Sequence, residues 1–362
     1  LEKTQWVFAC KDYVRFRLTG EAYAERTDYS GCNLVNLHTG EYDPELLKLF
    51  GLSEILDKLP PLKYSTDICG GITEKAAEKT GLKAGTPVAG GAFDIDACAL
   101  AVGITDEERV CMIAGTWSIN EYIRKTPVTD GSVMMNSFFC LPDYYLVEEC
   151  SPTSAGNNEW FMKNLLPELR EECKKTGKNI YEQMNEWVGE IPAEEFCPIY
   201  LPFLMASNVH PNALGSFVGI SNFHTRKHLL RSVYEGVAFS HRYHLEKLLA
   251  TRTEQPKSIR LAGGAARSPM WTQMFADVMK LPVEGVEVSE TGAFGCAVLA
   301  AVANGDASDA KEAADKMCRI LPKVEPDPAR SAVYDEKYRL YCQTIEALDG
   351  IWDSVQGYRD RH

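Results

Sequence analysis

The stretch that decides the fold runs from Ile259 to Met279 and reads IRLAGGAARSPMWTQMFADVM. Its apolar beginning predicts a buried strand, its Gly-Gly-Ala centre a turn, and its second half a helix. Ser268 suits the N-cap of that helix and Pro269 its first position. Two glycines let a ligand approach the backbone, and the free N–H groups of a helix start attract an anion. Taken alone, the stretch is equally consistent with a ligand site and with a plain strand-to-helix connection.

Predicted strands and helices alternate along the rest of the chain as well, which indicates an α/β architecture. We predict strands at 88–93, 110–114, 118–123, 200–204 and 283–288, and a domain boundary near Gly103. The segment 168–178 between two helices is charged and is expected to be a solvated connection. Helices are predicted at 1–18, 44–50, 53–58, from the Thr73 cap to Gly81, and at 157–165, 180–188, 225–250, 292–303 and from 328 onward.

Size and charge exclude several classes of protein. A length of 362 residues suggests two domains or one large one, and 45% hydrophobic residues suffice for a sizeable core. The net charge of −13 argues against a nucleic-acid partner, which needs a basic surface. No run of about 18 apolar residues is present, so no membrane span is expected.

The cysteines and the start of the chain are also informative. No two of the twelve cysteines are closer than ten positions, so no zinc pattern is present and we expect no metal site built by protein ligands alone. Scattered cysteines fit a reducing, cytoplasmic location. Leu1 is not an initiator methionine, and the residues after it lack the apolar core of a signal peptide. We therefore expect the chain to begin inside a longer sequence.

The segment from Val88 to Asp96, VAGGAFDID, offers a candidate catalytic carboxylate. An aspartate at the end of a strand lies where α/β proteins bind ligands, and Asp94 could take a proton from an alcohol as a general base. Asp94 could equally cap the helix that follows. For Asp96 we predict the capping role, because aspartate is among the best N-cap residues.

Two further segments could bind an anion. Gly115 and Thr116 follow a predicted strand, and a Gly-Thr turn between two strands can wrap N–H groups and a hydroxyl around a phosphate. An ordinary hairpin is the alternative. The segment SPTSAGNNEW from Ser151 to Trp160 contains Gly156 and precedes a helix. It could contact an anion or a ribose, although helix capping also accounts for it.

The histidines and the C-terminal pattern favour structural roles. His224 and His228 have the spacing of a helical zinc pair but lack the glutamate of a metalloprotease, so a solvated helix start is expected. His241 and His244 are expected to flank the same long helix. The last helix carries an apolar stripe that predicts a packing face, in the core or at an interface such as that of a homodimer. Its residues are Tyr334, Tyr338, Tyr341, Ile345, Leu348, Trp352 and Val355.

The order of these segments resembles the FGGY family of carbohydrate kinases. The segment 215–239 resembles the family's C-terminal signature, and Leu261 to Trp271 its adenosine motif. Gly115 and Thr116 resemble its second phosphate motif, and the segment from Gly90 to Asp94 its catalytic-aspartate motif. The motifs occur in family order, and further similar stretches extend the resemblance over essentially the whole chain.

The resemblance implies two actin-like, ribonuclease H-like domains, the first incomplete, with residues 1–103 belonging to the sugar domain and residues 104–362 to the nucleotide domain. It implies ATP-dependent phosphorylation of a ketopentose such as L-xylulose, with Mg²⁺ on the phosphates and Asp94 as the base, beside Phe93. The residues implied for ATP are Gly115, Thr116, Gly156, Gly263, Gly264, Ala265 and Ser268.

One feature departs from the family pattern. Members begin with an Asp-x-Gly phosphate loop and a further half-domain, which nothing here matches, so we expect this chain alone to be inactive. Two alternatives stay open. The substrate could be D-xylulose, D-ribulose or erythritol, or the chain could be a non-catalytic, actin-like ATP-binding module.

Overall fold

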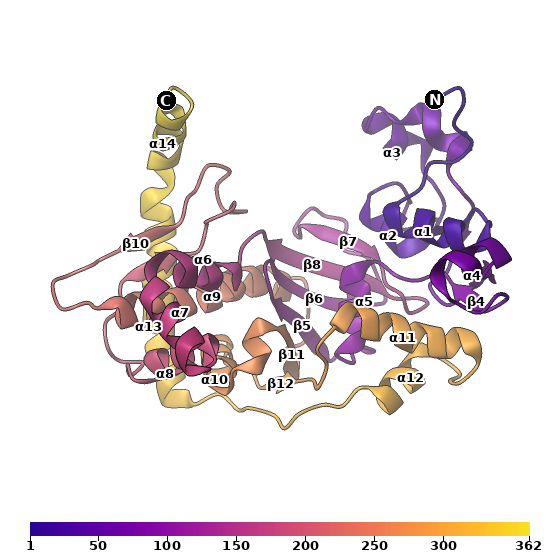
Figure 1. The fold of residues 1–362 in the computed structure, drawn as a ribbon. Coiled ribbons are helices and arrows are strands. Elements are labelled where there is room, and N and C mark those ends of the chain that lie inside the picture. Colours follow the sequence, from indigo (N-terminus) through magenta and orange to yellow (C-terminus); the bar gives the residue numbers. More distant parts are fainter. The chain divides into compact units, whose positions relative to one another are not determined.

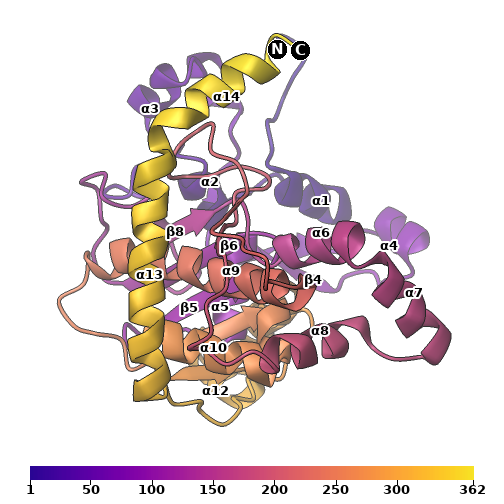
Figure 2. The same cartoon turned by 90° about the vertical axis from the view of Figure 1, so that its left-hand side faces the viewer.

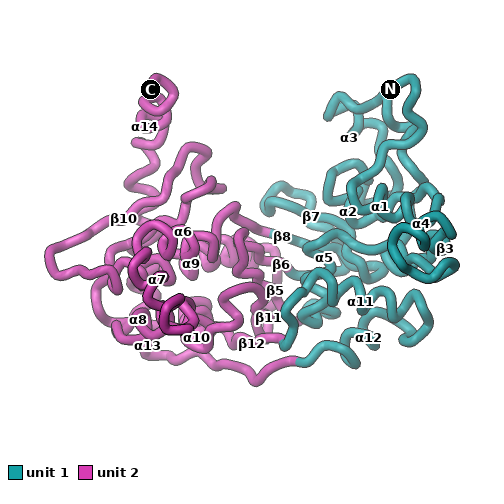
Figure 3. Tube along the Cα trace, in the orientation of Figure 1, with its two compact units in different colours: residues 1–107, 122–148, 287–319 teal, residues 108–121, 149–286, 320–362 magenta.

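The computed structural model describes residues 1–362, which form two compact units (Figure 3). Unit 1 contains residues 1–107, 122–148 and 287–319, and unit 2 contains residues 108–121, 149–286 and 320–362. Each unit therefore gathers segments that lie far apart in the sequence. Figure 1 labels the helices and strands, and Figure 2 shows them after a quarter turn.

Unit 1 is built mainly of short helices and strands (Figure 1). One hydrophobic cluster gathers Ala24, Tyr29, Val35, Leu47 and Ile55. The elements of unit 1 are α1 Cys10–Thr19, β1 Ala24–Glu25, α2 Arg26–Gly31, α3 Pro44–Leu49, the 3₁₀ helix η1 Ser53–Lys58, β2 Leu62–Lys63, β3 Ile68–Gly71, α4 Glu74–Thr80, β4 Pro87–Ala89, α5 Asp94–Ala101, β7 Met135–Phe138, α11 Thr291–Asn304 and α12 Ala310–Met317.

Unit 2 contains the long helices (Figure 2). Its elements are β5 Arg109–Ala114, α6 Gly156–Leu165, α7 Pro167–Thr176, α8 Ile180–Gly189, β9 Ile199–Leu201, β10 Ser216–Val218, α9 Arg226–Leu249, β11 Ser258–Gly263, the 3₁₀ helix η2 Gly264–Arg267, α10 Pro269–Met279, β12 Val283–Gly285, α13 Pro328–Leu348, η3 Asp349–Ile351 and α14 Trp352–Arg359. Two strands, β6 Ser118–Arg124 and β8 Tyr145–Ser151, have residues in both units.

Six strands are hydrogen-bonded in the order β12-β11-β5-β6-β8-β7. Strand β11 is parallel to both β12 and β5, whereas β5 and β6 are antiparallel. The register pairs Gly263, the last residue of β11, with Ala114, the last residue of β5. As a result, the Gly-Gly-Ala turn and the Gly115 turn begin side by side at the C-terminal ends of these two neighbouring strands.

The predicted stretch from Ile259 to Met279 folds as expected. It forms β11, η2 and α10, and the Ser268 hydroxyl accepts a hydrogen bond from the Trp271 backbone N–H at 3.2 Å. Thr73 caps α4 in the same way, and Gly81 ends that helix in the left-handed conformation. Helix α9 is also confirmed, with Thr225 as its N-cap. These elements have local signals at both ends, which makes them predictable from sequence.

In unit 1, the predicted boundaries of one helix and one strand are wrong. The first helix begins at Cys10 rather than Leu1, because the preceding residues bind other segments. The Val7 N–H donates to the Lys58 carbonyl oxygen, and the Ala9 N–H donates to the Tyr29 hydroxyl. The strand expected at 88–93 ends at Ala89 and is only partly buried. The Gly90 and Gly91 N–H groups donate to carbonyls of the segment before β3 rather than continuing the ladder.

Three further predictions need correction in unit 2. The charged segment 168–178 was expected to be a connection but forms α7, which Gly177 ends in the left-handed conformation; Leu169 and Cys173, four positions apart, are its only buried residues. His241 and His244 lie inside α9 and are fully buried, not at its ends. The last helix breaks at η3 into α13 and α14. Its apolar stripe is a packing face, with Tyr334, Tyr338, Tyr341, Ile345 and Trp352 buried.

Candidate functional site

A cavity of about 480 Å³ opens in unit 2. This volume lies in the range of roughly 300–1,000 Å³ that is typical of ligand sites. Of the residues predicted for a nucleotide, Gly115, Thr116, Gly156, Gly264 and Ser268 all line it. They come from three separate parts of the sequence, and the register of β11 on β5 explains why two of those parts meet.

The glycines leave the backbone open toward this cavity. A Cβ atom built on Gly115 would have no neighbour closer than 3.9 Å, and one on Gly264 would have none closer than 4.0 Å. A side chain at either position would therefore extend into free space. Two predicted residues, Gly263 and Ala265, do not line the cavity. Gly263 has a φ of +86° and lies so close to β5 that a Cβ would be 2.6 Å from the Ala114 carbonyl oxygen, and Ala265 is fully buried.

One wall of the cavity is aromatic, and neither of its two rings is among the residues predicted to bind ATP. The rings of Tyr234 and Trp271 lie 4.5 Å apart, and both residues line the cavity. The Trp271 Nε1 and Asn158 Oδ1 atoms are buried without a hydrogen-bond partner. Unpaired buried polar atoms are costly, so they point to a ligand that supplies the partners. The remaining lining residues are Ala155, Glu159, Asn179, Tyr181, Glu182, Asn185 and Arg267.

This combination suits a nucleotide. An aromatic wall with unpaired hydrogen-bonding atoms fits a flat heterocycle with a polar edge. Exposed glycine backbone with the exposed Thr116 beside it fits an anionic group. The only sequence signal for Asn158 and Trp271 was their closeness in sequence to Gly156 and Ser268, because their role depends on which helix faces pack on the cavity.

The candidate catalytic residue lies in unit 1. Asp94 is the first residue of α5, its side chain is exposed, and its Oδ1 accepts the Ile95 N–H at 3.0 Å. The N-cap position is taken by Phe93 without a side-chain hydrogen bond. The prediction that Asp96 caps this helix is therefore wrong, since Asp96 is its third residue and is fully buried. Phe93, predicted beside the substrate, packs its ring against Gly31 of α2.

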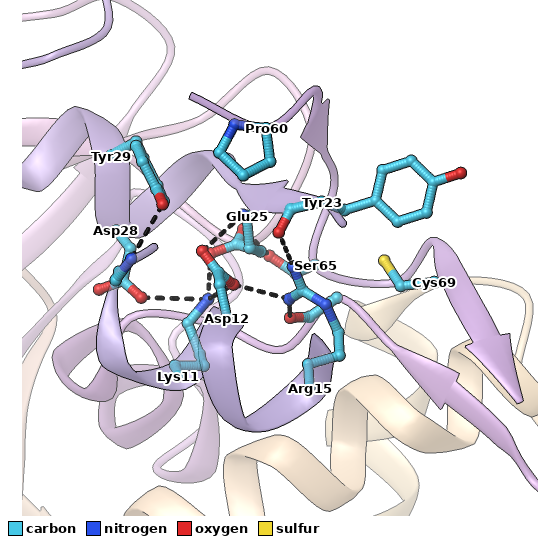
Figure 4. Close-up of polar contacts among 12 residues, drawn as sticks. Lys11, Asp12, Arg15, Tyr23, Glu25, Asp28, Tyr29, Pro60, Ser65 and Cys69 are labelled. Carbon is cyan, nitrogen blue, oxygen red and sulfur yellow. Dashed lines mark hydrogen bonds and ion pairs between the residues drawn. The ribbon is translucent and has the colours of Figure 1, made fainter. Parts of the chain in front are cut away.

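A buried network of charged side chains gathers on α1, β1 and α2 (Figure 4), and it is hydrogen-bonded to the segment that leads to Asp94. Arg15 forms an ion pair with Asp12 at 2.8 Å and donates to the carbonyl oxygens of Gly90 and Tyr23 at 2.5 and 2.6 Å. The Asp12 side chain is 0% exposed and that of Arg15 is 4% exposed. The Arg15 guanidinium therefore fixes the backbone at Gly90 from inside the unit.

Glu25 is the centre of the other half of this network. It forms an ion pair with Lys11 at 3.1 Å and accepts hydrogen bonds from the hydroxyls of Thr27 at 2.6 Å and Ser65 at 2.8 Å. The same Thr27 hydroxyl accepts the backbone N–H of Phe93 at 2.8 Å. Glu25 thus orients Thr27, and Thr27 holds the residue immediately before Asp94.

The network perturbs the acid–base behaviour of its members. Burial alone would lower the pKa of Lys11, but the charges of Glu25, Asp12 and Asp28 outweigh it and raise that pKa. Burial raises the pKa of Asp12, against the opposing effect of Lys11 and Arg15. The Lys11 ammonium therefore stays charged. It forms ion pairs with the carboxylates of Asp12, Glu25 and Asp28.

The other candidate groups have structural roles. His228 accepts the Thr225 backbone N–H, completing the cap of α9, and contacts Glu195 through Nε2 at 2.8 Å. No group of three or more His, Cys, Asp or Glu side chains is arranged to hold a metal ion. The twelve cysteines are free thiols. None of the helices combines the length and the apolar composition needed to cross a bilayer.

Comparison with known proteins agrees with the motif order. Family models of the FGGY family of carbohydrate kinases match the chain, the N-terminal domain over residues 1–101 and the C-terminal domain over residues 110–304. A probable L-xylulose kinase from Pasteurella multocida is 37% identical over 94% of this chain and 67% of its own length. The L-xylulose/3-keto-L-gulonate kinase of Escherichia coli is 38% identical over 95% of this chain and 67% of its own length.

A solved structure supports the fold directly. The xylulose kinase from Rhodospirillum rubrum superposes with a TM-score of 0.83 at 29% identity, covering 96% of this chain and 69% of that one. The chain thus spans about two thirds of the length of these relatives. The predicted resemblance is confirmed, and so is the predicted fold class, α/β with two actin-like, ribonuclease H-like domains.

Proposed function

The chain belongs to the FGGY family of carbohydrate kinases, and from this premise we propose that it phosphorylates a ketopentose such as L-xylulose with ATP as the donor. The observation that supports the ATP site is the cavity of about 480 Å³ in unit 2, which five residues chosen from sequence motifs line together. The two relatives named for L-xylulose support the choice of sugar. Residues 1–103 would serve the sugar and residues 104–362 the nucleotide.

In this proposal the cavity residues have separate tasks. Gly115 and Thr116 donate to the phosphates, and Gly156 lies beside them. The adenosine lies along Gly264 and Ser268, with its base against Trp271 and Tyr234. Asn158 Oδ1 and Trp271 Nε1 gain partners from the nucleotide. Gly263 and Ala265 act indirectly, by setting the shape of the turn.

Asp94 would act as the general base. As the sugar hydroxyl oxygen bonds to the γ-phosphorus, the bond from that phosphorus to the bridging oxygen of ADP breaks, and the hydroxyl proton passes to the Asp94 carboxylate. In such a loose transition state, positioning and charge stabilisation supply most of the rate. Two observations support this role: the Asp94 side chain is exposed, and the backbone before it is held by hydrogen bonds at Gly90 and Phe93.

Magnesium fits this chain only as an ion carried by the nucleotide. No cluster of protein ligands is present to form a cage. Mg²⁺ commonly keeps its waters and binds through substrate phosphates with one or two carboxylates, so such a cage is not required. When bound, it would neutralise charge on the β- and γ-phosphates.

A filled-cavity variant tests the nucleotide site. Gly264→Val adds a Cβ whose nearest neighbour would be the Ala114 carbonyl oxygen at 4.0 Å, so we expect the protein to fold and to lose ATP binding in isothermal titration calorimetry. Gly350→Val is the matched control in the same unit, because a Cβ there meets no atom within 4 Å and Gly350 does not line the cavity. Unchanged ATP affinity in Gly264→Val would refute the proposed site.

A substrate panel tests the reaction. The product of the complete gene is assayed for sugar-dependent ADP release with L-xylulose, D-xylulose, D-ribulose and erythritol at equal concentrations. We expect the highest kcat/KM with L-xylulose. A higher value for another sugar would correct the substrate, and ATP binding without ADP release for any of the sugars would favour a non-catalytic module.

A further inference from the structure

His241 connects the two segments that form the phosphate end of the cavity. It lies inside α9 with its side chain fully buried. Its Nδ1 is 3.0 Å from the Ser118 hydroxyl and 3.1 Å from Asn120 Oδ1, both on β6, the strand that follows Gly115 and Thr116. Its Nε2 is 2.9 Å from the hydroxyl of Ser154, which precedes α6. One imidazole therefore links two segments far apart in sequence.

The neighbours of His241 determine its protonation state. The Asn120 amide donates through Nδ2 to the Glu149 carbonyl at 3.3 Å, so its Oδ1 faces His241. A carbonyl oxygen only accepts, which places the proton on His241 Nδ1. Burial, together with His244, lowers the pKa of His241 to about 3, so the ring is neutral at physiological pH. Nε2 is then an acceptor, and the Ser154 hydroxyl donates to it.

Ser154 connects His241 to the Gly115–Thr116 turn. Its backbone N–H donates to the Thr116 carbonyl at 2.9 Å. Its own carbonyl accepts the backbone N–H of Asn157 at 3.0 Å and the Asn157 side-chain amide at 2.8 Å, in the first turn of α6. A Cβ on Gly156 would lie 3.7 Å from the same Thr116 oxygen. The position of Ser154 thus sets how Thr116 and Gly156 lie relative to each other.

We infer that His241 is a positioning residue for phosphate binding, acting through Ser154 on Thr116 and Gly156 and through Ser118 on the strand after the turn. This inference rests on the proposed ATP site, and His241 itself does not line the cavity. The neutral ring suits the task because its unprotonated Nε2 accepts the hydrogen bond from the Ser154 hydroxyl, which a protonated ring could not accept. The two ring nitrogens have different tasks, and this difference makes the role testable.

Two substitutions separate the nitrogens. The amide of His241→Gln reaches the Nε2 position and can accept from Ser154, whereas that of His241→Asn reaches only the Nδ1 position and can donate to Asn120. We expect the Asn variant to raise the Kd and KM for ATP by about 10-fold, the scale of one buried hydrogen bond left unmade. The Gln variant should stay within about 3-fold of wild type, and the KM for the sugar should not change in either.

Ser154→Ala gives an independent measurement that removes only the hydroxyl. It should weaken ATP binding in the wild-type background and have no further effect in His241→Asn, because the bond it removes is already absent there. Thermal unfolding of each variant reports any loss of stability separately.

The outcomes distinguish this inference from the proposed function. If wild-type protein binds no ATP in calorimetry, the proposed site itself fails. If wild type binds ATP but the Asn and Gln variants lose equal affinity, if neither loses any, or if the effects of Ser154→Ala and His241→Asn simply add, the positioning role of His241 is wrong. A selective loss in the Asn variant, with coupling to Ser154, supports it.

Discussion

Two turns of this chain are held from inside by buried polar side chains, but by opposite means. The segment from Gly90 to Asp94 rests on charged groups: Arg15 holds Gly90, and Glu25 holds Thr27 and through it Phe93. The Gly115–Thr116 turn rests on uncharged groups, with His241 holding Ser154 and Ser154 holding Thr116. Both arrangements constrain the backbone rather than the functional side chain itself.

The difference matters for what each turn must do. A charged network gives strong directional attachment, but removing one partner leaves a buried charge uncompensated. The hydrogen bonds of a neutral network are individually weaker, but removing one partner leaves no buried charge unpaired. The two turns should therefore respond differently to substitution and to pH, and four experiments examine that difference.

The largest effect is expected from Arg15→Met. It removes the principal partner of the buried Asp12 carboxylate and one anchor of Gly90. Loss of one member of a buried ion pair costs about 3–5 kcal/mol, to be measured as the free energy of unfolding in urea. Arg17→Met is the control on the same helix, because Arg17 is exposed and bonds only the Tyr13 hydroxyl. Equal effects of the two variants would show that the charged network does not stabilise the unit.

Asp94→Asn, measured in the complete kinase, should have the next largest effect, and it should change kcat alone. Loss of a general base lowers kcat by at least ~10²-fold, while the Kd for ATP stays unchanged because Asp94 does not line the nucleotide cavity. Glu74→Gln is a matched control, an exposed acid in the first turn of α4. Steady-state kinetics and calorimetry give both quantities. Near-normal turnover would remove Asp94 from the mechanism and leave the charged network without a catalytic purpose.

These two regions also show which parts of the fold could be predicted from the sequence. Ser268, Pro269 and the paired glycines predicted a strand, a turn and a helix correctly, because caps and left-handed glycines are local signals. The same locality explains the failures. Helix α7 has only two buried positions in a charged stretch, and the strand after Pro87 stops because Gly90 bonds a carbonyl far from it in sequence.

The site was predictable only in part, for the same physical reason. Gly115, Thr116, Gly156, Gly264 and Ser268 could be chosen from motifs, and one cavity contains them all. Trp271, Tyr234 and Asn158 lie inside the quoted segments, but they could not be chosen individually, because their roles depend on the packing of three helices around that cavity. His241 was expected at a helix end, since nothing in its sequence neighbourhood indicates that partners from β6 and from the segment before α6 enclose it.

Acidification should change the free energy of unfolding in opposite directions through the two networks. The pKa of His241 is lowered to about 3, so between pH 6.5 and 3 the unfolded chain binds a proton that the native ring does not. Stability should therefore fall on acidification through that range, by up to ~1.4 kcal/mol per pH unit. The raised pKa of Asp12 acts in the opposite direction, because the native carboxyl is protonated first as the pH falls. The difference between wild type and His241→Gln in urea unfolding isolates the His241 part, and identical pH slopes would exclude a neutral buried ring.

The smallest effect should come from Thr27, the one hydroxyl that links the charged network to the residue before Asp94. Thr27→Val keeps the shape but removes the acceptor for the Phe93 N–H and the donor to Glu25. Of these two hydrogen bonds, only the one from Phe93 reaches the segment before Asp94. It is worth about 0.5–1.5 kcal/mol, so kcat should fall by roughly 2- to 10-fold while the KM for ATP is unchanged. Thr27→Ser keeps the hydroxyl and should recover most of kcat. If the Ser variant were as slow as the Val variant, the methyl packing of Thr27 rather than its hydroxyl would hold the segment, and the two turns would differ less than their hydrogen bonds indicate.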